Sequence, residues 1–190
     1  MPKVMRADPF APMDGLLTPS AKRPNWPHTV VPNSCGGACF ERTEAVFGRH
    51  KDAMRRLGID RGYLLSTHGP AGVGVETLIR WSDAPLPIHI HHLTESERRK
   101  LRRRAADPEA REAVEALSAD IVAVWREMGG VHLQIGRKYP YFETRLPPTA
   151  ALPRTLKRQL DPDGIIDPHN LFGVPVPTGQ AALGGVTTRG

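Results

Sequence analysis

A run of basic and aromatic side chains follows an expected strand in the carboxyl-terminal third of the chain. Residues 131–135 alternate with period two, which places His132 and Gln134 on the polar face of that strand. Gly136 ends the run, and it is followed at once by Arg137, Lys138, Tyr139 and Tyr141. Such a loop can hold an anionic or planar ligand, and the alternative is a solvated turn.

A second group with possible chemistry is the histidine cluster His89, His91 and His92. In a strand, the first two would point to the same side, roughly 6–7 Å apart, which is close enough to share a metal ion. No acidic or cysteine ligand accompanies them, and Pro85 and Pro87 favour a surface segment. We therefore expect no metal site, and prefer a surface or substrate-facing cluster.

Two further motifs are incomplete. Cys35 and Cys39 cannot close a four-ligand zinc site by themselves. The glycine-rich connection over residues 68–74 lacks the lysine of a phosphate-binding loop and leads to a strand, so we expect no phosphate cradle there.

The elements that must position these residues follow from periodicity and capping. We predict helices over residues 43–57 (with Thr43 as N-cap), 94–106, 109–128 (after Asp107 and Pro108) and 152–160. Strands are predicted over 61–67, 75–81 and 131–135, with Glu76, Leu78 and Arg80 on one face of the second. The interleaving, without a Rossmann glycine motif, predicts an α+β fold with helices layered on an antiparallel sheet.

Composition sets the outer bounds. The 190 residues carry a net charge of +6, which permits nucleic-acid binding, but the arginines gather in one helix over residues 98–104 and no nucleic-acid motif accompanies them. No long apolar stretch or signal peptide is present, so we expect no integral membrane segment and a cytoplasmic location, with peripheral membrane contact as an alternative. We expect residues 1–42 to form a proline-rich arm and 174–190 a tail.

The phrase LDPDGIIDPHNLFG, at residues 160–173 after a short helix, resembles the carboxyl end of FAD-linked oxidoreductases of the vanillyl-alcohol oxidase type. That group includes glycolate oxidase, D-lactate dehydrogenase and 4-cresol dehydrogenase. Asp161-Pro162-Asp163-Gly164 is also a turn signature in its own right, because proline fixes φ and glycine supplies a positive φ. The resemblance extends over residues 43–173, and GGVHLQIGRKYPY stands at the expected spacing upstream.

The resemblance implies a ferredoxin-like cap domain that faces the substrate of an FAD enzyme. In that reading, His132 and Tyr139 are candidate catalytic residues. Arg80, Gln134, Arg137 and Lys138 would bind a small hydroxy acid or alcohol, and Asn170 would lie near the flavin. The competing interpretations are that His132 and Arg80 are plain surface residues and that Tyr139 only packs.

The chain departs from the family pattern in several places. Asp167 stands where Asn is common, and His169-Asn170 replaces Gly-Lys, so the charge of that lysine is missing. His68 matches the first histidine of a metal-binding motif found in the glycolate-oxidase branch, but Glu76 holds the place of the second. A metal of that kind is therefore not expected.

Family members also carry a separate FAD-binding domain, which residues 1–42 could not form. The resemblance therefore implies a fragment or subunit that works with a flavin-binding partner and is inactive alone. The alternative from another class is a non-catalytic ferredoxin-like module that recruits a partner through its basic helix.

Overall fold

The computed structural model describes residues 22–91, 93–101, 104–132, 139 and 141–166. These residues belong to two compact units, one spanning residues 1–133 and the other residues 134–190. Each unit is described by itself. The first contains a four-stranded antiparallel sheet with its helices, and the second contains a single long helix.

The sheet is built around β4 (Gly72–Ser82), the longest strand. Strand β3 (Asp60–His68) pairs along one edge of β4, with Asp60 opposite Arg80 and His68 opposite Gly72. The other edge pairs in two segments, β1 (Lys22–Asn25) near Ser82 and β2 (His28–Pro32) near Gly72. An α+β fold with an antiparallel sheet is thereby confirmed.

Strands β1 and β2 correct the arm predicted over residues 1–42, because from Lys22 onward the chain belongs to the sheet. Their prolines obscure the alternation, yet proline is tolerated on an outer strand, where a missing N–H leaves no ladder bond unmade. Pro24 pairs with Arg80 in this way, and Pro27 separates the two segments. Residues 1–21 lie outside the described part.

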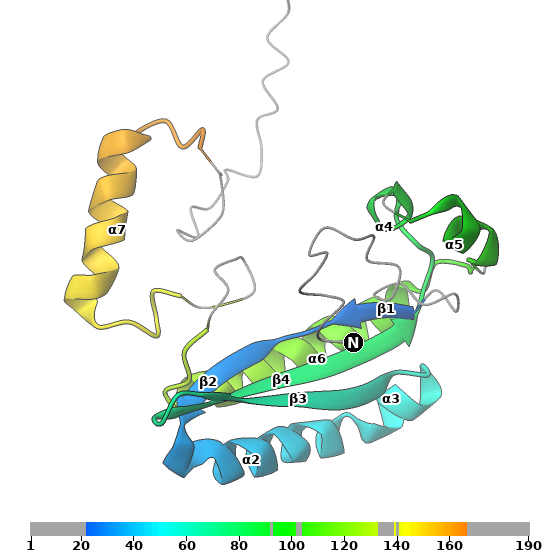
Figure 1. Cartoon of the computed structure of the whole chain (residues 1–190), viewed down its shortest axis with the longest axis horizontal. Coiled ribbons are helices and arrows are strands. Elements are labelled where there is room, and N and C mark those ends of the chain that lie inside the picture. Colours follow the sequence, from blue (N-terminus) through cyan, green and yellow to red (C-terminus); the bar gives the residue numbers. More distant parts are fainter. Residues whose placement is uncertain (1–21, 92, 102–103, 133–138, 140, 167–190) are drawn as a thin grey trace, which may run out of the picture. The chain divides into compact units, whose positions relative to one another are not determined.

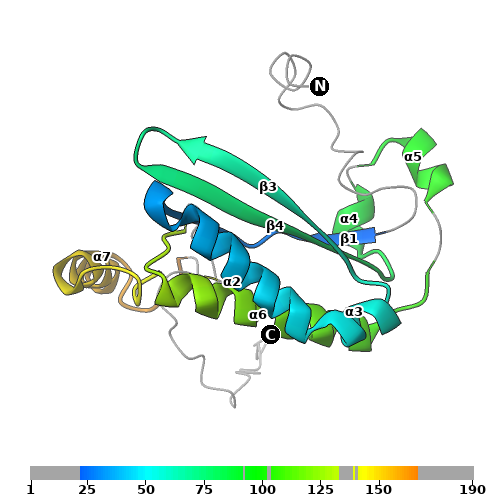
Figure 2. The same cartoon turned by 90° about the horizontal axis from the view of Figure 1, so that it is seen from below.

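The longer helices of the first unit and the short α3 pack on one face of the sheet (Figures 1 and 2). They are α2 (Gly36–Arg49), α3 (Lys51–Arg56) and α6 (Pro108–Glu127). A 3-10 turn over Asn33–Cys35 leads into α2. The core between these layers includes the buried side chains of Val31, Val46, Val75, Ile79, Leu117, Ile121 and Trp125.

Capping explains which helix ends were predictable. Asp107 Oδ1 accepts a hydrogen bond of 2.9 Å from the Ala110 N–H, and Pro108 occupies the first turn, so the predicted start of α6 is confirmed. Thr43 is not an N-cap, because α2 begins seven residues earlier, at Gly36. Its hydroxyl is buried instead, donating to the Cys39 carbonyl at 2.7 Å and accepting from Trp125 Nε1 at 2.9 Å.

Two short helices, α4 (Pro87–His91) and α5 (Glu95–Lys100), lie beside the end of the sheet where β1 pairs with β4 (Figures 1 and 2). The strand geometry assumed for His89 and His91 is therefore wrong, since Pro87 opens a helical turn there. The basic helix ends at Lys100 and does not reach residue 106. Among the described residues, no helix is long and apolar enough to cross a membrane.

The strand predicted over residues 131–135 is described only at its start. Val131 forms an antiparallel bridge with Val30, on the side of β2 away from β4. Counting this bridge, the chain order is strand, helix, strand, strand, helix, strand, as a ferredoxin-like layout requires. That detail stays a prediction, because residues 133–138 lie outside the described part.

The second unit is organised by α7 (Pro147–Leu160), which begins five residues before the helix predicted over 152–160. Pro147 occupies the first turn and Pro153 lies inside the helix. The turn predicted at residues 161–164 is confirmed, with Gly164 at φ 66°. Residues 167–190, which include Asn170 and the predicted tail, lie outside the described part.

Candidate functional site

Alternate residues of β4 point away from α2, α3 and α6, and we call this side of the sheet the outer face. The residues facing the helices, such as Val75 and Ile79, are buried, whereas Glu76 and Leu78 between them are half-buried and Arg80 is exposed. The predicted grouping of Glu76, Leu78 and Arg80 on one face is therefore confirmed.

Glu76 lies at the centre of the outer face. The register sets it directly opposite His28 of β2 on one side and Leu64 of β3 on the other. Cross-strand partners of this kind hold their Cβ atoms roughly 5 Å apart. A carboxyl group, an imidazole and an exposed leucine thus become neighbours although the sequence separates them widely.

A small cavity of about 50 Å³ opens at this place. Its volume exceeds the roughly 30 Å³ that one water occupies in the liquid, so it suits a functional group and not a whole substrate. The cavity is lined by His28, Thr29, Leu64, Ser66, His68, Gly74, Val75 and Glu76.

Gly74 makes room for two of these side chains. A Cβ at position 74 would lie 2.6 Å from both His68 Nε2 and Ser66 Oγ, closer than real Cβ contacts allow. The space above the glycine lets these two atoms, both from side chains of β3, form a hydrogen bond of 3.1 Å. No described carboxylate is hydrogen-bonded to His68, so the pair lacks the third group that orients the base in nucleophilic catalysis.

The two titratable groups at the centre are biased toward their uncharged forms. His28 is buried, and burial, together with the nearby His132, lowers the pKa of its imidazole. Burial alone raises the pKa of the Glu76 carboxyl. A neutral imidazole beside a carboxylate of increased basicity can accept and relay a proton.

His132, one of the predicted catalytic residues, lies next to this cluster but is itself buried. Its Nδ1–H donates to the His28 carbonyl oxygen at 2.8 Å, and the two imidazole rings meet edge to face with centroids 6.3 Å apart. The structure therefore places the His132 ring against that of His28, and the catalytic role predicted for His132 stays a prediction.

Arg80, predicted to bind substrate, lies toward the other end of the outer face. Its Nε donates to Asp60 Oδ1 at 2.8 Å, and Lys22 pairs with the same carboxylate. Burial raises the pKa of Asp60, but the hydrogen bonds from Lys22 and Arg80 outweigh this and hold the pKa below its ordinary value. The Arg80 guanidinium thus already has one anionic partner.

The remaining predicted site residues belong to the second unit or to undescribed segments. Tyr139 is half-buried. The predicted substrate-binding residues Gln134, Arg137 and Lys138 and the flavin-proximal Asn170 lie outside the described residues, so their roles stay predictions.

The turn that carries the family resemblance is closed by one side chain. Asp161 is buried, and its carboxylate accepts from the Ile165 N–H at 2.8 Å and the Ile166 N–H at 3.0 Å. Lys157, one helical turn earlier, pairs with the same carboxylate and also donates to the Ile166 carbonyl. The hydrogen bond from Lys157 leads the causes that lower the pKa of Asp161. Residues 161–166 therefore form a hydrogen-bonded turn that ends α7.

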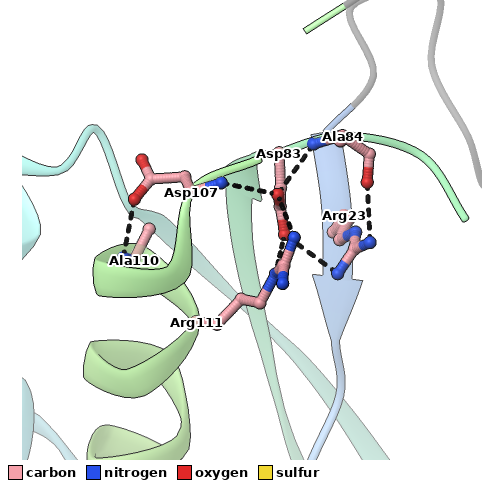
Figure 3. A network of polar contacts seen from close by, with 6 residues as sticks. All are labelled: Arg23, Asp83, Ala84, Asp107, Ala110 and Arg111. Carbon is pink, nitrogen blue, oxygen red and sulfur yellow. Dashed lines mark hydrogen bonds and ion pairs between the residues drawn. The ribbon is translucent and has the colours of Figure 1, made fainter. Parts of the chain in front are cut away.

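A second polar cluster lies on the helix side of the sheet, and its central carboxylate, Asp83, is surrounded by donors (Figure 3). Asp83, with 0% of its surface exposed, accepts two hydrogen bonds from Arg111, at 2.6 and 2.9 Å, and pairs with Arg23 at 2.9 Å. The N–H groups of Ala84 and Asp107 also donate to it, at 2.7 and 2.9 Å. This network joins β1, the end of β4 and the start of α6, which is a structural role.

The sequence signals for these clusters were uneven. The predicted strands and connections contain Ser66, His68 and Glu76. His28, in contrast, lies in the segment predicted as an arm, where its spacing from Val30 was the only local indication of a strand. No group of three or more histidine, cysteine, aspartate or glutamate residues in the described part of the chain is placed to hold a metal ion.

Comparison with known proteins adds no relative. No family model matches the chain, and neither the curated proteins nor the solved structures contain a match.

Proposed function

We propose that this chain is the substrate-facing, carboxyl-terminal part of an FAD-dependent oxidoreductase. It would act on a small hydroxy acid or alcohol, together with a flavin-binding domain or subunit. The outer face of the sheet is the surface that would cover substrate and flavin. The observation that carries the proposal is the pairing of Glu76 with His28 at a small cavity on that face.

The outer face suits a planar ring with polar edges. Leu64 is 55% exposed and Leu78 half-buried, so both offer apolar contact on either side of Glu76. Gly62 lies opposite Leu78 and adds no side chain, whereas the Ser66 and His68 side chains occupy the space above Gly74. An isoalloxazine ring would therefore lie over Gly62, Leu64 and Leu78.

When bound, the flavin supplies a hydride acceptor at N5. The protein must then take the proton of the substrate hydroxyl. Glu76 is the best-placed described base, because burial raises the pKa of its carboxyl and so strengthens it as a proton acceptor. His28, held neutral by burial, presents an imidazole that can hydrogen-bond to the substrate oxygen without adding charge.

The second unit supports the same proposal through its turn. Asp161 and Lys157 close the LDPDGII segment with hydrogen bonds to the backbone of Ile165 and Ile166. The described part of the phrase that carries the resemblance, residues 160–166, thus has a defined turn, whereas Asn170 cannot supply the charge of the family lysine.

The alternative, a module that recruits a partner through a basic helix, has less support. Helix α5 spans only six residues. Arg98 donates to the Ile90 and His91 carbonyls at 3.3 and 3.1 Å, and Arg99 pairs with Glu95. Much of its cationic hydrogen-bonding capacity is therefore used within the chain.

The test is a titration of FAD with the purified full chain, followed by the visible absorbance and fluorescence of the flavin. We expect saturable binding that Glu76→Leu and the pair Arg137→Ala and Lys138→Ala weaken. Added hydroxy acid should not bleach the flavin, since the proposal assigns hydride transfer to a complex with a flavin-binding domain or subunit. The matched control is Glu95→Gln on α5, remote from the outer face. A flavin spectrum that the chain leaves unchanged at every concentration would overturn the proposal.

A further inference from the structure

The second unit contains a pocket of about 450 Å³ beside α7, in the size range of small-molecule sites. It is formed by residues of the segment 142–158 alone, so it does not depend on the placement of the two units. Its lining consists of Phe142, Arg145, Pro147, Ala150, Ala151, Arg154, Thr155 and Arg158.

Three of these eight residues are arginines, and none is acidic. No described residue forms an ion pair with Arg145, Arg154 or Arg158. Within the described residues, the only hydrogen bond of their guanidinium groups is a long one of 3.4 Å, from Arg158 Nη2 to Thr155 Oγ1. The pocket thus collects three positive charges whose donors are almost entirely unused by the described part of the chain.

Aromatic contacts fix the directions of two guanidinium groups. Arg154 lies over the Phe142 ring at 4.3 Å from its centroid, and Arg145 lies over the Tyr141 ring at 4.7 Å. Arg158 follows Arg154 by one helical turn and therefore shares its side of α7. Because the side chains are already ordered, binding an anion would cost less conformational entropy.

Arg145 gives an independent indication of a missing partner. Its Nε is buried and has no hydrogen-bond partner among the described residues. Buried polar atoms are nearly always paired, so the Arg145 Nε–H needs an acceptor, which an anion in the pocket would supply.

We propose that this pocket binds the phosphate or pyrophosphate group of a small organic ester. A carboxylate has one charge and two oxygens, so it can satisfy one arginine and leaves the other two cations to repel each other. A phosphate monoester brings about two charges and three acceptor oxygens, and a pyrophosphate brings more. The apolar floor of Phe142, Pro147, Ala150 and Ala151 would contact the organic part.

The experiment is a calorimetric titration of the purified full chain with phenyl phosphate, inorganic pyrophosphate and benzoate at low salt. We expect saturable one-to-one binding of both phosphates and much weaker binding of benzoate. Arg154→Gln should weaken phosphate binding about tenfold or more, since it removes charge-assisted hydrogen bonds. The phosphate affinity of Arg154→Lys should lie between those of the wild type and Arg154→Gln. Lysine keeps the positive charge but lacks the planar guanidinium that can donate two parallel hydrogen bonds.

The matched control is Arg99→Gln, which removes the same charge from an arginine on α5. Equal loss of affinity in both glutamine variants would reduce the binding to general charge attraction and overturn the proposal. Benzoate binding as tight as phenyl phosphate, or no saturable binding, would overturn it too. Arg154 is exposed, so its variants should fold, and circular dichroism checks this.

The source of the phosphate group can be distinguished in the same assay. Competition between pyrophosphate and FAD would identify the flavin dinucleotide as the source, and pyrophosphate binding without competition would identify another phosphoester. The inference holds in both cases. It is also independent of the outer-face proposal, because Arg154 variants and Glu76 variants affect different surfaces.

Discussion

The two polar clusters of the sheet unit differ in how completely their groups are satisfied. Asp83 is fully buried and receives donors from two arginines and two backbone N–H groups, so its charge is compensated from every side. Glu76 is half-buried on the outer face, and burial shifts the pKa of its carboxyl upward. The difference separates a cluster whose charges are compensated within the fold from one whose carboxyl group has no compensating cation among the described residues.

The largest expected effect is on stability, from Asp83→Asn. Removing one partner of a buried ion pair typically costs about 3–5 kcal/mol, because the remaining charge, here on the buried Arg23, is left uncompensated. Urea unfolding measures the loss. Asp60→Asn is the matched control, since Asp60 also pairs with two cations but its side chain is 37% exposed, and it should lose less than about 1 kcal/mol. Equal losses of unfolding free energy in Asp83→Asn and Asp60→Asn would show that the buried ion pairs contribute no more to stability than the exposed ones.

The next expected effect is a pH dependence specific to Asp83. Burial raises the pKa of Asp83, but the hydrogen bonds from Arg111 and from the Asp107 and Ala84 N–H groups, with the charge of Arg23, hold it well below the ordinary value. The stabilisation is therefore complete above the unfolded pKa of about 3.9 and is lost as the pH falls from there through the folded pKa. The free energy of unfolding should be measured for the wild type and for Asp83→Asn between neutral and acid pH. The difference between the two proteins should become smaller as the pH falls. A constant gap would contradict this account.

Glu76→Gln should have a smaller effect on stability, in the opposite direction. The raised pKa means that the folded state disfavours the charge, so the contribution of Glu76 to stability is complete below its unfolded pKa and declines as the pH rises. At neutral pH the neutral amide should leave the protein unchanged or stabilise it by a few tenths of a kcal/mol. Thermal unfolding at neutral pH provides the measurement. A large destabilisation would instead assign Glu76 to the fold.

The smallest expected effect is on the pKa of the His28 imidazole. Burial is the larger cause of the lowered pKa of His28, and His132 is the second. We expect the His28 imidazole to titrate below about 6.5 in an NMR pH series. The variant His132→Gln should raise this pKa while leaving it below the model-peptide value. An unchanged pKa in the variant would show that His132 does not influence the charge of His28.

Local signals predicted the parts of the fold whose geometry is encoded locally. The Asp107-Pro108 start of α6, the alternation of β3 and β4 and the Asp161–Gly164 turn each depend on neighbours within a few residues. The start of α2 was missed because Thr43, a good capping residue by type, is used inside the helix to bond Trp125 of α6.

The candidate site depends on pairing that no local pattern shows. His28 meets Glu76 only because β2 pairs with β4, 48 residues later in the chain. Prolines at positions 24, 27 and 32 concealed both amino-terminal strands. The buried carboxylate of Asp83 likewise depends on cations that are distant in sequence. These are Arg111, 28 positions away, and Arg23 of β1. The sequence indicated Glu76 and Arg80 on one face but could not supply their partners.

We propose that the outer face of the sheet receives flavin and substrate. An NMR titration of the isotope-labelled full chain with FAD tests this at the level of single residues, because it detects even weak binding. We expect chemical-shift changes concentrated on His28, Leu64, Ser66, Glu76 and Leu78, and their loss in Glu76→Leu. Changes confined to α2 and α6, or no changes at any FAD concentration, would contradict it.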